Sequence, residues 1–461
     1  MPSEPASATA RVSEFVAGFD LATASDLVRA RAADLLADTF AVAIAASADE
    51  FAHILAPLAE DAAGPSTLLG QGRGGSPGLA ALYNGSLAHA LEFDDSTLNP
   101  VGHPSAVIVP ALFALAEQRG ASGGALLEAY LAGLEVHSRL GQAEAGGWSA
   151  AGAWFPIGHV SLLGAAAACA RLLGLDAART AHALGLAANA SGVLAVSGGS
   201  AAKPLGAGAA ARSGLEAALL AAAGATAPAD VLERPQGFAD VFLGGSAGLA
   251  KALEHIGAPH HLEEVGVALK RYPSCYATHW GVDALLLLVQ EHSLAPGDVA
   301  AIILDHPVAG AFCDNPDPRD PEAARFSHEY NLAVALLDGV PGPSSYLPER
   351  LAAADVREML GRVRTRNHPS DLAPPKAWEY RVTVTTTSGA ALSKAVPRPL
   401  GHPRHPMSPA DVRAKFFTCV TPSLGEGGAE QLLGLLLGIE RLPDMAALSR
   451  LLLTIKAAET V

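Results

Sequence analysis

The stretch YRVTVTTTSGAALSKAV, residues 380–396, alternates polar and apolar residues on both sides of Ser388 and Gly389. Alternation with a period of two is typical of strands with one buried face, and Ser-Gly marks a turn, so the stretch predicts a β-hairpin. A second run, VAAIILDHP at residues 299–307, predicts a buried strand. We therefore expect residues 267–403 to form an α+β domain.

Helical periodicity flanks this domain on both sides. ASGGALLEAYLAGLEVHSRLG, residues 121–141, has an apolar stripe at i, i+3, i+4 and i+7, and residues 25–258 are rich in Ala and Leu with similar spacing. Helical spacing returns after Ser408, a plausible N-cap. The predicted fold is mostly α with an inserted α+β domain: residues 1–266 and 404–461 form one helical domain, and residues 267–403 a smaller one.

Composition limits the possible functions of the chain. Half of its 461 residues are apolar and only 17% are charged, compared with roughly 25% in typical soluble domains, so much of the chain must be buried. The net charge of −15, without a Lys/Arg-rich block, argues against nucleic acid and anionic membranes as partners. The first 15 residues lack the pattern of a secretory signal and no transmembrane helix is indicated, so we expect a cytoplasmic protein.

The sequence shows no metal or phosphate motif of convincing spacing. The four cysteines are scattered without a C-x-x-C pair, which favours reduced, buried thiols. GQGRGGSPG, residues 70–78, lacks the ending of a P-loop and predicts a flexible loop. His260–His261 and GHPRHP, residues 401–406, are the nearest metal candidates, and the adjacent pair His260–His261 is expected to be solvent-exposed on a polar loop. We expect no metal, and turnover that survives chelation.

Candidate chemistry lies in polar islands within apolar sequence. Lys203, between Ala and Pro, is unusual because a buried ammonium is costly unless it is paired or used. His103 precedes a proline and either caps a turn or carries protons. Taken alone, Tyr330 and His279 are typical of core residues with a satisfied polar end. The islands gain weight only when they are considered together.

Together these islands resemble the 2-methylcitrate dehydratase family, MmgE/PrpD, over nearly the whole chain. ALYNGSLAHALEFDDS and HPSAVIVPALFALAE are similar to its N-G-x-x-A-H-x-L-D-[FY]-D-D-[TS] and H-P-S signature. KPLGAGAAARSGLEAALLAAAGA resembles its K-P-L-H-x-G-x-A-A-R-N-G segment. YPSC with TH resembles its lid motif, and ARFSHEY its F-S-x-x-Y segment.

The resemblance implies an enzyme without metal or organic cofactor that acts on small anionic carboxylates. Members of the family dehydrate 2-methylcitrate, decarboxylate cis-aconitate or epimerise iminodisuccinate. Each reaction moves charge at a carbon next to a carboxylate, which requires a base and nearby cations. The resemblance also implies a large helical domain, an α+β lid with the pocket between the two, and a homodimer.

The resemblance places the site on several segments. Lys203 is expected to bind a substrate carboxylate, His103 to transfer protons, and Tyr330 to act as a donor or acid. Glu92 is expected to orient His103, whereas Asp94 and Asp95 tie the adjoining loop. The remaining expected members are His279 as a catalytic group, and Arg271, Arg212 and Ser96 at the substrate.

Departures from the family pattern change one side of the expected pocket. Phe155 and Ile157 stand where the family has His and Thr, Gly206 replaces the His of K-P-L-H, and Glu92 replaces Asp. His159 lies one helical turn after Phe155, and so is a candidate to replace the missing imidazole. A drier pocket favours a substrate with fewer carboxylates or an apolar branch.

Three classes of function remain open from the sequence. The leading hypothesis is a lyase of the hydratase or dehydratase type. The alternative is an epimerase, an isomerase, or a decarboxylase of a di- or tricarboxylate. The third is a protein that binds a metabolite without turnover, which is disfavoured because His103, Lys203, His279 and Tyr330 are all present.

Overall fold

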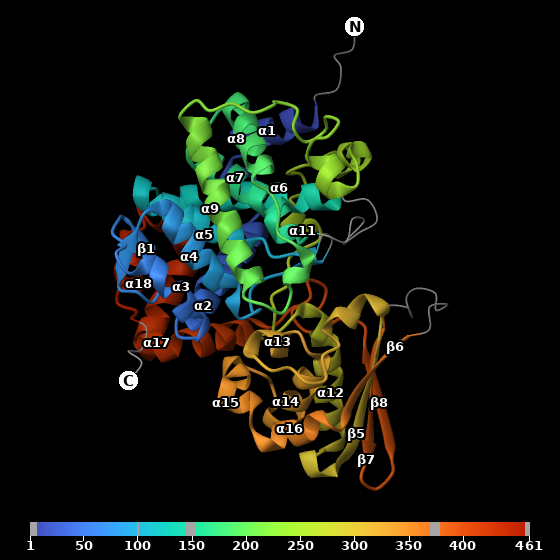
Figure 1. Ribbon diagram of the computed structural model, residues 1–461. Coiled ribbons are helices and arrows are strands. Elements are labelled where there is room, and N and C mark those ends of the chain that lie inside the picture. Colours follow the sequence, from blue (N-terminus) through green and yellow to red (C-terminus); the bar gives the residue numbers. More distant parts are fainter. Residues whose placement is uncertain (1–6, 99–100, 144–153, 369–378, 457–461) are drawn as a thin grey trace.

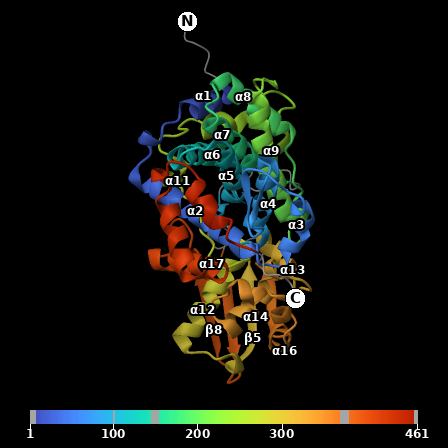
Figure 2. The same ribbon diagram turned by 90° about the vertical axis from the view of Figure 1, so that its left-hand side faces the viewer.

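The computed structural model describes residues 7–98, 101–143, 154–368 and 379–456. The first six residues of the N-terminal stretch, and residues 99 and 100 on the way to His103, lie outside the described residues. A helical domain and a smaller α+β domain are stacked end to end (Figure 1). Figure 2 shows the same two bodies from the side.

The helical domain is a stack of helices with small residues at their contacts. A Cβ on Gly133 of α6 would lie 2.5 Å from the carbonyl oxygen of Gly164 in α7, so these two helices pack backbone to backbone. The smaller α+β domain is called the lid. The α-helices that precede it are α1 (Ala8–Gly18), α2 (Asp26–Ala46), α3 (Phe51–Ala59), α4 (Pro77–Ala90), α5 (Ser105–Arg119), α6 (Gly123–Gln142), α7 (Val160–Leu172), α8 (Ala177–Asn189), α9 (Ala202–Ala222), α10 (Leu249–Ala252) and α11 (His261–Glu264).

The C-terminal helices return to this domain. α17 (Pro409–Leu437), which breaks at Gly425, packs on α2, and α18 (Ala446–Leu452) follows it. Their buried side chains, including Phe416 and Leu448, belong to the same apolar core as those of α1 to α9. Ser408 caps α17 as the sequence predicts, because its side chain accepts from the backbone of Asp411.

The lid has its own apolar core, between a sheet and helices that cover one side of it (Figure 1). The strands β5 (Val299–His306), β6 (Val363–Asn367), β7 (Tyr380–Thr386) and β8 (Ala391–Val396) form a sheet in the order β6-β5-β7-β8. β5 and β6 are parallel, and the other two pairs are antiparallel. The helices are α12 (His279–His292), α13 (Pro321–Arg325), α14 (His328–Asp338), α15 (Pro348–Leu351) and α16 (Ala354–Leu360).

Both sequence predictions for strands are confirmed, and one loop prediction is wrong. Residues 299–306 form β5, and β7 and β8 form the predicted hairpin. The glycine-rich stretch was expected to be a flexible loop, but it belongs to a hairpin of β1 (Ser66–Leu68) and β2 (Arg73–Gly75). Gly70 and Gly72 adopt positive φ at its turn, which glycine allows at little cost. The chain also forms the short pair β3 (Thr97–Leu98) and β4 (Val101–Gly102).

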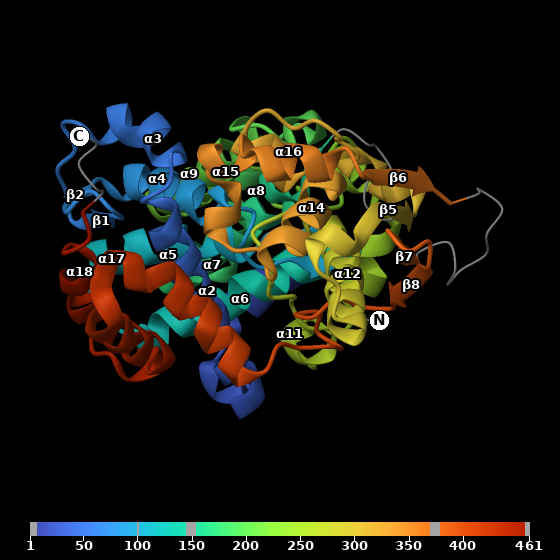
Figure 3. The ribbon, with the colours of Figure 1, turned by 90° about the horizontal axis from the view of Figure 1, so that it is seen from below.

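The two connections between the domains run side by side. Ser96 and Ala268 exchange two backbone hydrogen bonds of 2.8 Å, and the N–H of Leu269 donates to the carbonyl of Gly401 at 3.1 Å. Gly401 has φ +94°, and a Cβ there would lie 2.0 Å from the Leu269 carbonyl oxygen, so this crossing requires glycine. Seen from below, the lid covers one end of the helical domain (Figure 3).

Within the described residues, no single helix is long and apolar enough to cross a membrane. α2 and α3 together meet the criterion of length and composition, but they are bent by 90° at the break between them.

Candidate active site

The candidate site begins where α4 ends. Leu91 is the C-cap of α4, and Glu92 follows with φ 50°, in the left-handed region that residues other than glycine rarely adopt. Such strain persists only where surrounding contacts hold it, and it is frequent at functional sites. The turn aims three buried carboxylates, of Glu92, Asp94 and Asp95, into the molecule.

Two buried lysines from distant parts of the chain neutralise Glu92. Lys203, in the first turn of α9, pairs with one carboxylate oxygen. Lys270, from the connection to the lid, lies 2.9 Å from the other oxygen and donates to the Glu92 carbonyl at 3.0 Å. Only 3% of Lys203 and none of Lys270 is exposed. Glu92 therefore joins two cations that arrive from distant parts of the chain.

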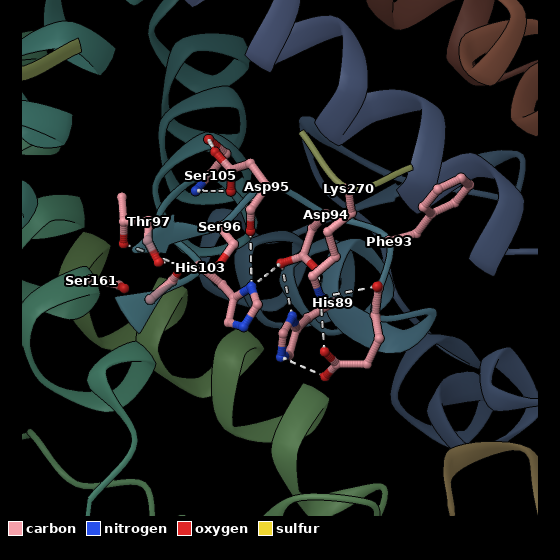
Figure 4. A network of polar contacts seen from close by, with 12 residues as sticks. His89, Phe93, Asp94, Asp95, Ser96, Thr97, His103, Ser105, Ser161 and Lys270 are labelled. Atoms are coloured by element: carbon pink, nitrogen blue, oxygen red, sulfur yellow. Dashed lines mark hydrogen bonds and ion pairs between the residues drawn. The ribbon is translucent and has the colours of Figure 1, made fainter. Parts of the chain in front are cut away.

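Two histidines, His89 and His103, lie beside the carboxylate of Asp94 (Figure 4). His89 has its Nδ1 at 2.8 Å from Asp94 Oδ2 and its Nε2 at 3.3 Å from Glu92 Oε1. His103 Nδ1 lies 2.9 Å from the Asp95 carbonyl oxygen and 3.3 Å from Asp94 Oδ2. A carbonyl can only accept, so Nδ1 of His103 carries the proton. Its Nε2 then presents a lone pair, as a general base requires.

The charges around this cluster fix its protonation. Burial alone would raise the pKa of Glu92, but Lys203 and Lys270 outweigh it and hold that pKa well below its usual range. Burial lowers the pKa of His103 to about 4, against the opposing charge of Asp94. His103 is therefore a neutral base at physiological pH. His89, Asp94 and His103 have ligand atoms within 4.8 Å of one another, but Lys270, 3.8 Å from Asp94, already supplies the positive charge.

The carboxyl group of Asp95 differs in protonation from those of Glu92 and Asp94. Its carboxyl contacts the Ser105 hydroxyl and accepts from the Ser105 backbone N–H at 3.2 Å, and no Lys or Arg pairs with it in the described part of the chain. Burial raises its pKa to about 8 against these hydrogen bonds, and the charge of Asp94 raises it further. Asp95 is therefore protonated at neutral pH, and it ties the loop to α5 as a neutral group.

This state predicts a pH dependence of stability. The unfolded carboxyl titrates near 3.9 and the folded one near 8, so the folded state holds the proton more tightly. The stabilising contribution is complete below about pH 4 and is lost as pH rises to 8, by at most about 1.4 kcal/mol per pH unit. Asp95→Asn is expected to remove this loss, as measured by urea unfolding between pH 5 and 8. Asp26→Asn, on an exposed carboxylate, is the matched control. Identical slopes for Asp95→Asn and the wild type would contradict the assignment.

Aromatic rings from both domains cover Lys203. Its Nζ lies 5.4 Å from the centre of the Phe155 ring and 5.1 Å from that of Phe326, which belongs to the lid. Phe326 packs with the buried Cys275 and Cys313. A hydrogen bond with Cys313 lowers the pKa of Cys275 against burial, and the charges of Lys270 and Lys203 lower it further. The lid therefore places an apolar wall and a thiol beside the cluster.

Two residues expected at the site lie in the lid. The Tyr330 hydroxyl donates to the carbonyl of Ser345 at 2.6 Å, within the lid core, so the structure does not bring it to the cluster. His279 is buried between the rings of Tyr272 and Tyr276, and its Nε2 lies 3.3 Å from the Ser274 carbonyl oxygen. Burial and the charge of Lys270 hold its pKa well below the usual range.

The expected substrate ligands also separate. Arg212 is half-exposed and pairs with Glu216 at 2.7 Å on the surface of α9. It follows Lys203 by nine residues, or two and a half helical turns, so it projects from the opposite side of the helix. Arg271, which is 29% exposed, lies over the Tyr272 ring at 5.5 Å and 3.9 Å from the carboxylate of Asp283.

The remaining expected ligands have packing roles in the structure. Ile157 is 1% exposed in the helical core. A Cβ on Gly206 would lie 3.0 Å from the side chain of Val193. Ser96 serves the connection to the lid through its backbone, and its hydroxyl donates to the Thr97 carbonyl at 3.2 Å. Of the departures from the family pattern, Phe155 and Glu92 are in contact with Lys203, whose ammonium faces the Phe155 ring and pairs with the Glu92 carboxylate.

His159 packs in an aromatic group beyond Phe155. Its Nδ1 lies 2.9 Å from the Phe155 carbonyl oxygen, and its ring stacks on Phe242 with centres 5.3 Å apart. Burial lowers its pKa to about 4, and its Nε2 has no hydrogen-bond partner among the described residues. The proposal that His159 replaces the missing histidine stays a prediction.

Sequence reasoning missed three members of the cluster. These are His89 and Cys275, which lie within the motif segments but were not singled out there, and Lys270, two residues before YPSC. Lys270 offered a signal of the same kind as Lys203, because a lysine that follows an apolar run is costly to bury without a carboxylate. Its pairing with Glu92, 178 residues away, required the fold.

Comparisons with known proteins agree with this architecture. The family model of the MmgE/PrpD N-terminal domain matches residues 10–248, and that of the MmgE/PrpD C-terminal domain matches residues 272–437. Cis-aconitate decarboxylase of Mus musculus is 32% identical over 388 residues, which is 82% of this chain and 78% of the relative. The Homo sapiens protein of the same name is 32% identical over 386 residues, 82% and 79% of the two chains. That of Aspergillus terreus is 26% identical over 422 residues, 87% and 86%.

Proposed function

This chain belongs to the MmgE/PrpD family and is a lyase of the dehydratase or decarboxylase type; we propose that it transfers a proton at the carbon next to a carboxylate, without a cofactor. The observation that carries the proposal is the geometry of His103. Its Nδ1 proton is held by the Asp95 carbonyl, and its neutral ring leaves Nε2 as the base.

Lys203 is the proposed anchor for the substrate. An ammonium has three N–H donors. Within the described residues, Lys203 uses one of these donors in a hydrogen bond, to the carboxylate of Glu92. Lys270, by contrast, donates to both the carboxylate and the carbonyl of Glu92. Lys203 therefore has donors left for a substrate carboxylate, and Lys270 holds Glu92 in place when Lys203 turns to that substrate.

The proposed chemistry needs no further charged group. His103 Nε2 removes the proton next to the bound carboxylate, and the C–H electron pair moves into the carboxylate as an enediolate that Lys203 stabilises. In a dehydration, the electron pair then expels the hydroxyl group from the adjacent carbon. The new imidazolium, which Asp94 stabilises at 3.3 Å, returns its proton to that hydroxyl, and water leaves.

The proposed substrate is a small acid with an apolar portion beside its carboxylate. Phe155 and Phe326 place two ring faces against Lys203, and these faces offer no donor to a second or third carboxylate. Both rings cover the ammonium, so substrate entry requires one of them to move. Decarboxylation of cis-aconitate is the second candidate, favoured by the names of the relatives at 32% identity.

Proton NMR in deuterium oxide tests the proposal across a panel of possible substrates. The protein is incubated with small hydroxy and unsaturated carboxylic acids, cis-aconitate and 2-methylcitrate among them, without added cofactor. Loss of water from a hydroxy acid with few carboxylates is the expected result. Loss of CO₂ from cis-aconitate supports the second candidate, and exchange without net conversion indicates an epimerase instead. Turnover that appears only after a cofactor is added would contradict the proposal.

Assembly and location are also part of the proposal. We expect a homodimer, as the resemblance implies, and a location in the cytoplasm, which the four free cysteines favour. A molar mass of one chain, measured by light scattering at working concentration, would contradict the expected dimer.

A further inference from the structure

A second group of potential ligands lies in the lid, outside the proposed site. His306 ends β5, Asp314 directly follows the short helix η8 (Val308–Cys313), and His328 begins α14. One ligand atom from each of these three residues lies within 4.8 Å of the other two. Both histidines are buried, and the Asp314 side chain is 26% exposed.

Backbone carbonyls fix the tautomers of both histidines. His306 Nδ1 lies 2.9 Å from the Pro307 carbonyl oxygen, and His328 Nε2 lies 3.2 Å from that of Gly310. Carbonyls only accept, so these two nitrogens carry the protons. The lone pairs of His306 Nε2 and His328 Nδ1 are left inside the cluster. A histidine that ligates a metal typically donates its other ring N–H to a carbonyl in this way.

The inner atoms of this cluster lack a donor. His306 Nε2, His328 Nδ1 and Asp314 Oδ1 are buried without a hydrogen-bond partner in the described residues, although His306 Nε2 and Asp314 Oδ1 are 2.8 Å apart. No Lys or Arg pairs with Asp314 in the same part of the chain, whereas Lys270 and Lys203 serve the Glu92 cluster. Three facing acceptors are unfavourable unless a cation lies between them.

We propose that His306, Asp314 and His328 bind a divalent transition metal of the Zn²⁺ class. Two imidazoles and one carboxylate are ligands that Zn²⁺ accepts, at bond lengths of about 2.0–2.2 Å. Ligands of such a tetrahedral ion lie about 3.3–3.6 Å apart, so Asp314 moves by about half an ångström from His306 on binding. The exposed part of Asp314 gives the ion a route from solvent and a water as fourth ligand.

The proposed metal would hold η8 and Cys313 in place, and this segment packs behind the proposed active site. Cys313 immediately precedes Asp314 and is hydrogen-bonded to Cys275, which lies beside the Lys203–Glu92 cluster. A Cβ on Gly310 would lie 2.7 Å from the Tyr380 hydroxyl and 3.2 Å from His306 Nδ1, so η8 is already packed against the cluster. The expectation of no metal rested on sequence spacing, and gaps of eight and fourteen residues match no ligand motif.

Metal titration of the full-length protein tests the inference independently of turnover. The protein is stripped with a chelator, dialysed, and titrated with ZnCl₂ by calorimetry. The expected result is one equivalent bound, with a midpoint of thermal unfolding that rises with the Zn²⁺ concentration. Co²⁺ is expected to give ligand-field absorption bands of a tetrahedral N/O site. Failure to bind Zn²⁺ more tightly than about 10 μM would overturn the proposal.

Variants locate the ion. Asp314→Asn and His328→Gln are expected to weaken Zn²⁺ binding by about 10²-fold or more, because each removes one ligand. Asp314 is partly exposed, so its variant remains informative even where His328→Gln does not fold. His103→Gln, in the other His–Asp–His group, and the exposed His405→Gln are matched controls and should bind as the wild type does. Binding lost in either control, or kept in Asp314→Asn, would refute the assignment.

Discussion

Lys203→Met is expected to lower kcat/KM by about 10³-fold or more, the largest effect of any single change at the site. The ammonium is the proposed partner of the substrate carboxylate and of the charge that develops on it. Methionine fills a similar volume between Phe155 and Phe326 but carries no charge. The measurement is steady-state kinetics on the substrate identified by NMR.

The same change removes one partner of a buried carboxylate, so stability and turnover must be separated. Breaking a buried ion pair costs about 3–5 kcal/mol, because the remaining charge is uncompensated, although Lys270 still holds Glu92. The double variant Glu92→Gln/Lys203→Met removes both charges. It is expected to recover none of the turnover and little of the stability in urea unfolding, because the buried Lys270 then loses its pairing with Glu92 and keeps only Asp94, at 3.8 Å.

Arg139→Met is the matched control for this experiment. Arg139 is also buried, and its Nε pairs with the buried Glu135 at 2.7 Å, outside the Glu92 cluster. Its loss should reduce stability in the same way while the remaining folded enzyme keeps its kcat/KM. If Lys203→Met retains wild-type kcat/KM, or if Arg139→Met loses as much, the role given to Lys203 is wrong.

His103→Gln is expected to lower kcat by about 10²-fold or more with little change in KM, the usual effect of losing a positioned acid–base group. The glutamine amide can still donate to the Asp95 carbonyl, so the loop keeps its main contact. Because burial lowers the pKa of His103 to about 4, wild-type kcat/KM should be flat at neutral pH and fall as the pH drops through about 4.

His159→Gln is the discriminating comparison for His103→Gln, because His159 is itself a candidate for the missing catalytic histidine. Both side chains are largely buried, both lie within hydrogen-bonding distance of a backbone carbonyl through Nδ1, and burial lowers the pKa of both to about 4. The stacking of His159 on Phe242 predicts a loss of stability with near-normal turnover. A loss of kcat equal to that of His103→Gln would instead show that His159 has taken over from the histidine missing at Phe155.

The sequence was sufficient for features that depend on neighbouring residues. Alternation over residues 380–396 predicts the hairpin, Ser408 predicts a helix N-cap, and ordered motif segments identify the family. His103 and Lys203 were also accessible, because a proline neighbour and a lone charge in apolar sequence mark them locally. Such features depend only on the periodicity and composition of short segments, so they can be predicted from the sequence.

Tertiary structure alone decided which residues meet. Glu92 pairs with both Lys203 and Lys270. Tyr330, although part of a motif, donates its hydroxyl hydrogen to the Ser345 carbonyl inside the lid core. Arg212 shares a motif with Lys203, but its side chain projects from the opposite side of α9 and pairs with Glu216. Charge pairing, burial and tautomer depend on atoms brought together across more than a hundred residues of chain, and no local pattern encodes those distances. The triad of His306, Asp314 and His328 exists for the same reason, because the packing of a strand, a short helix and an α-helix turns their lone pairs toward one another.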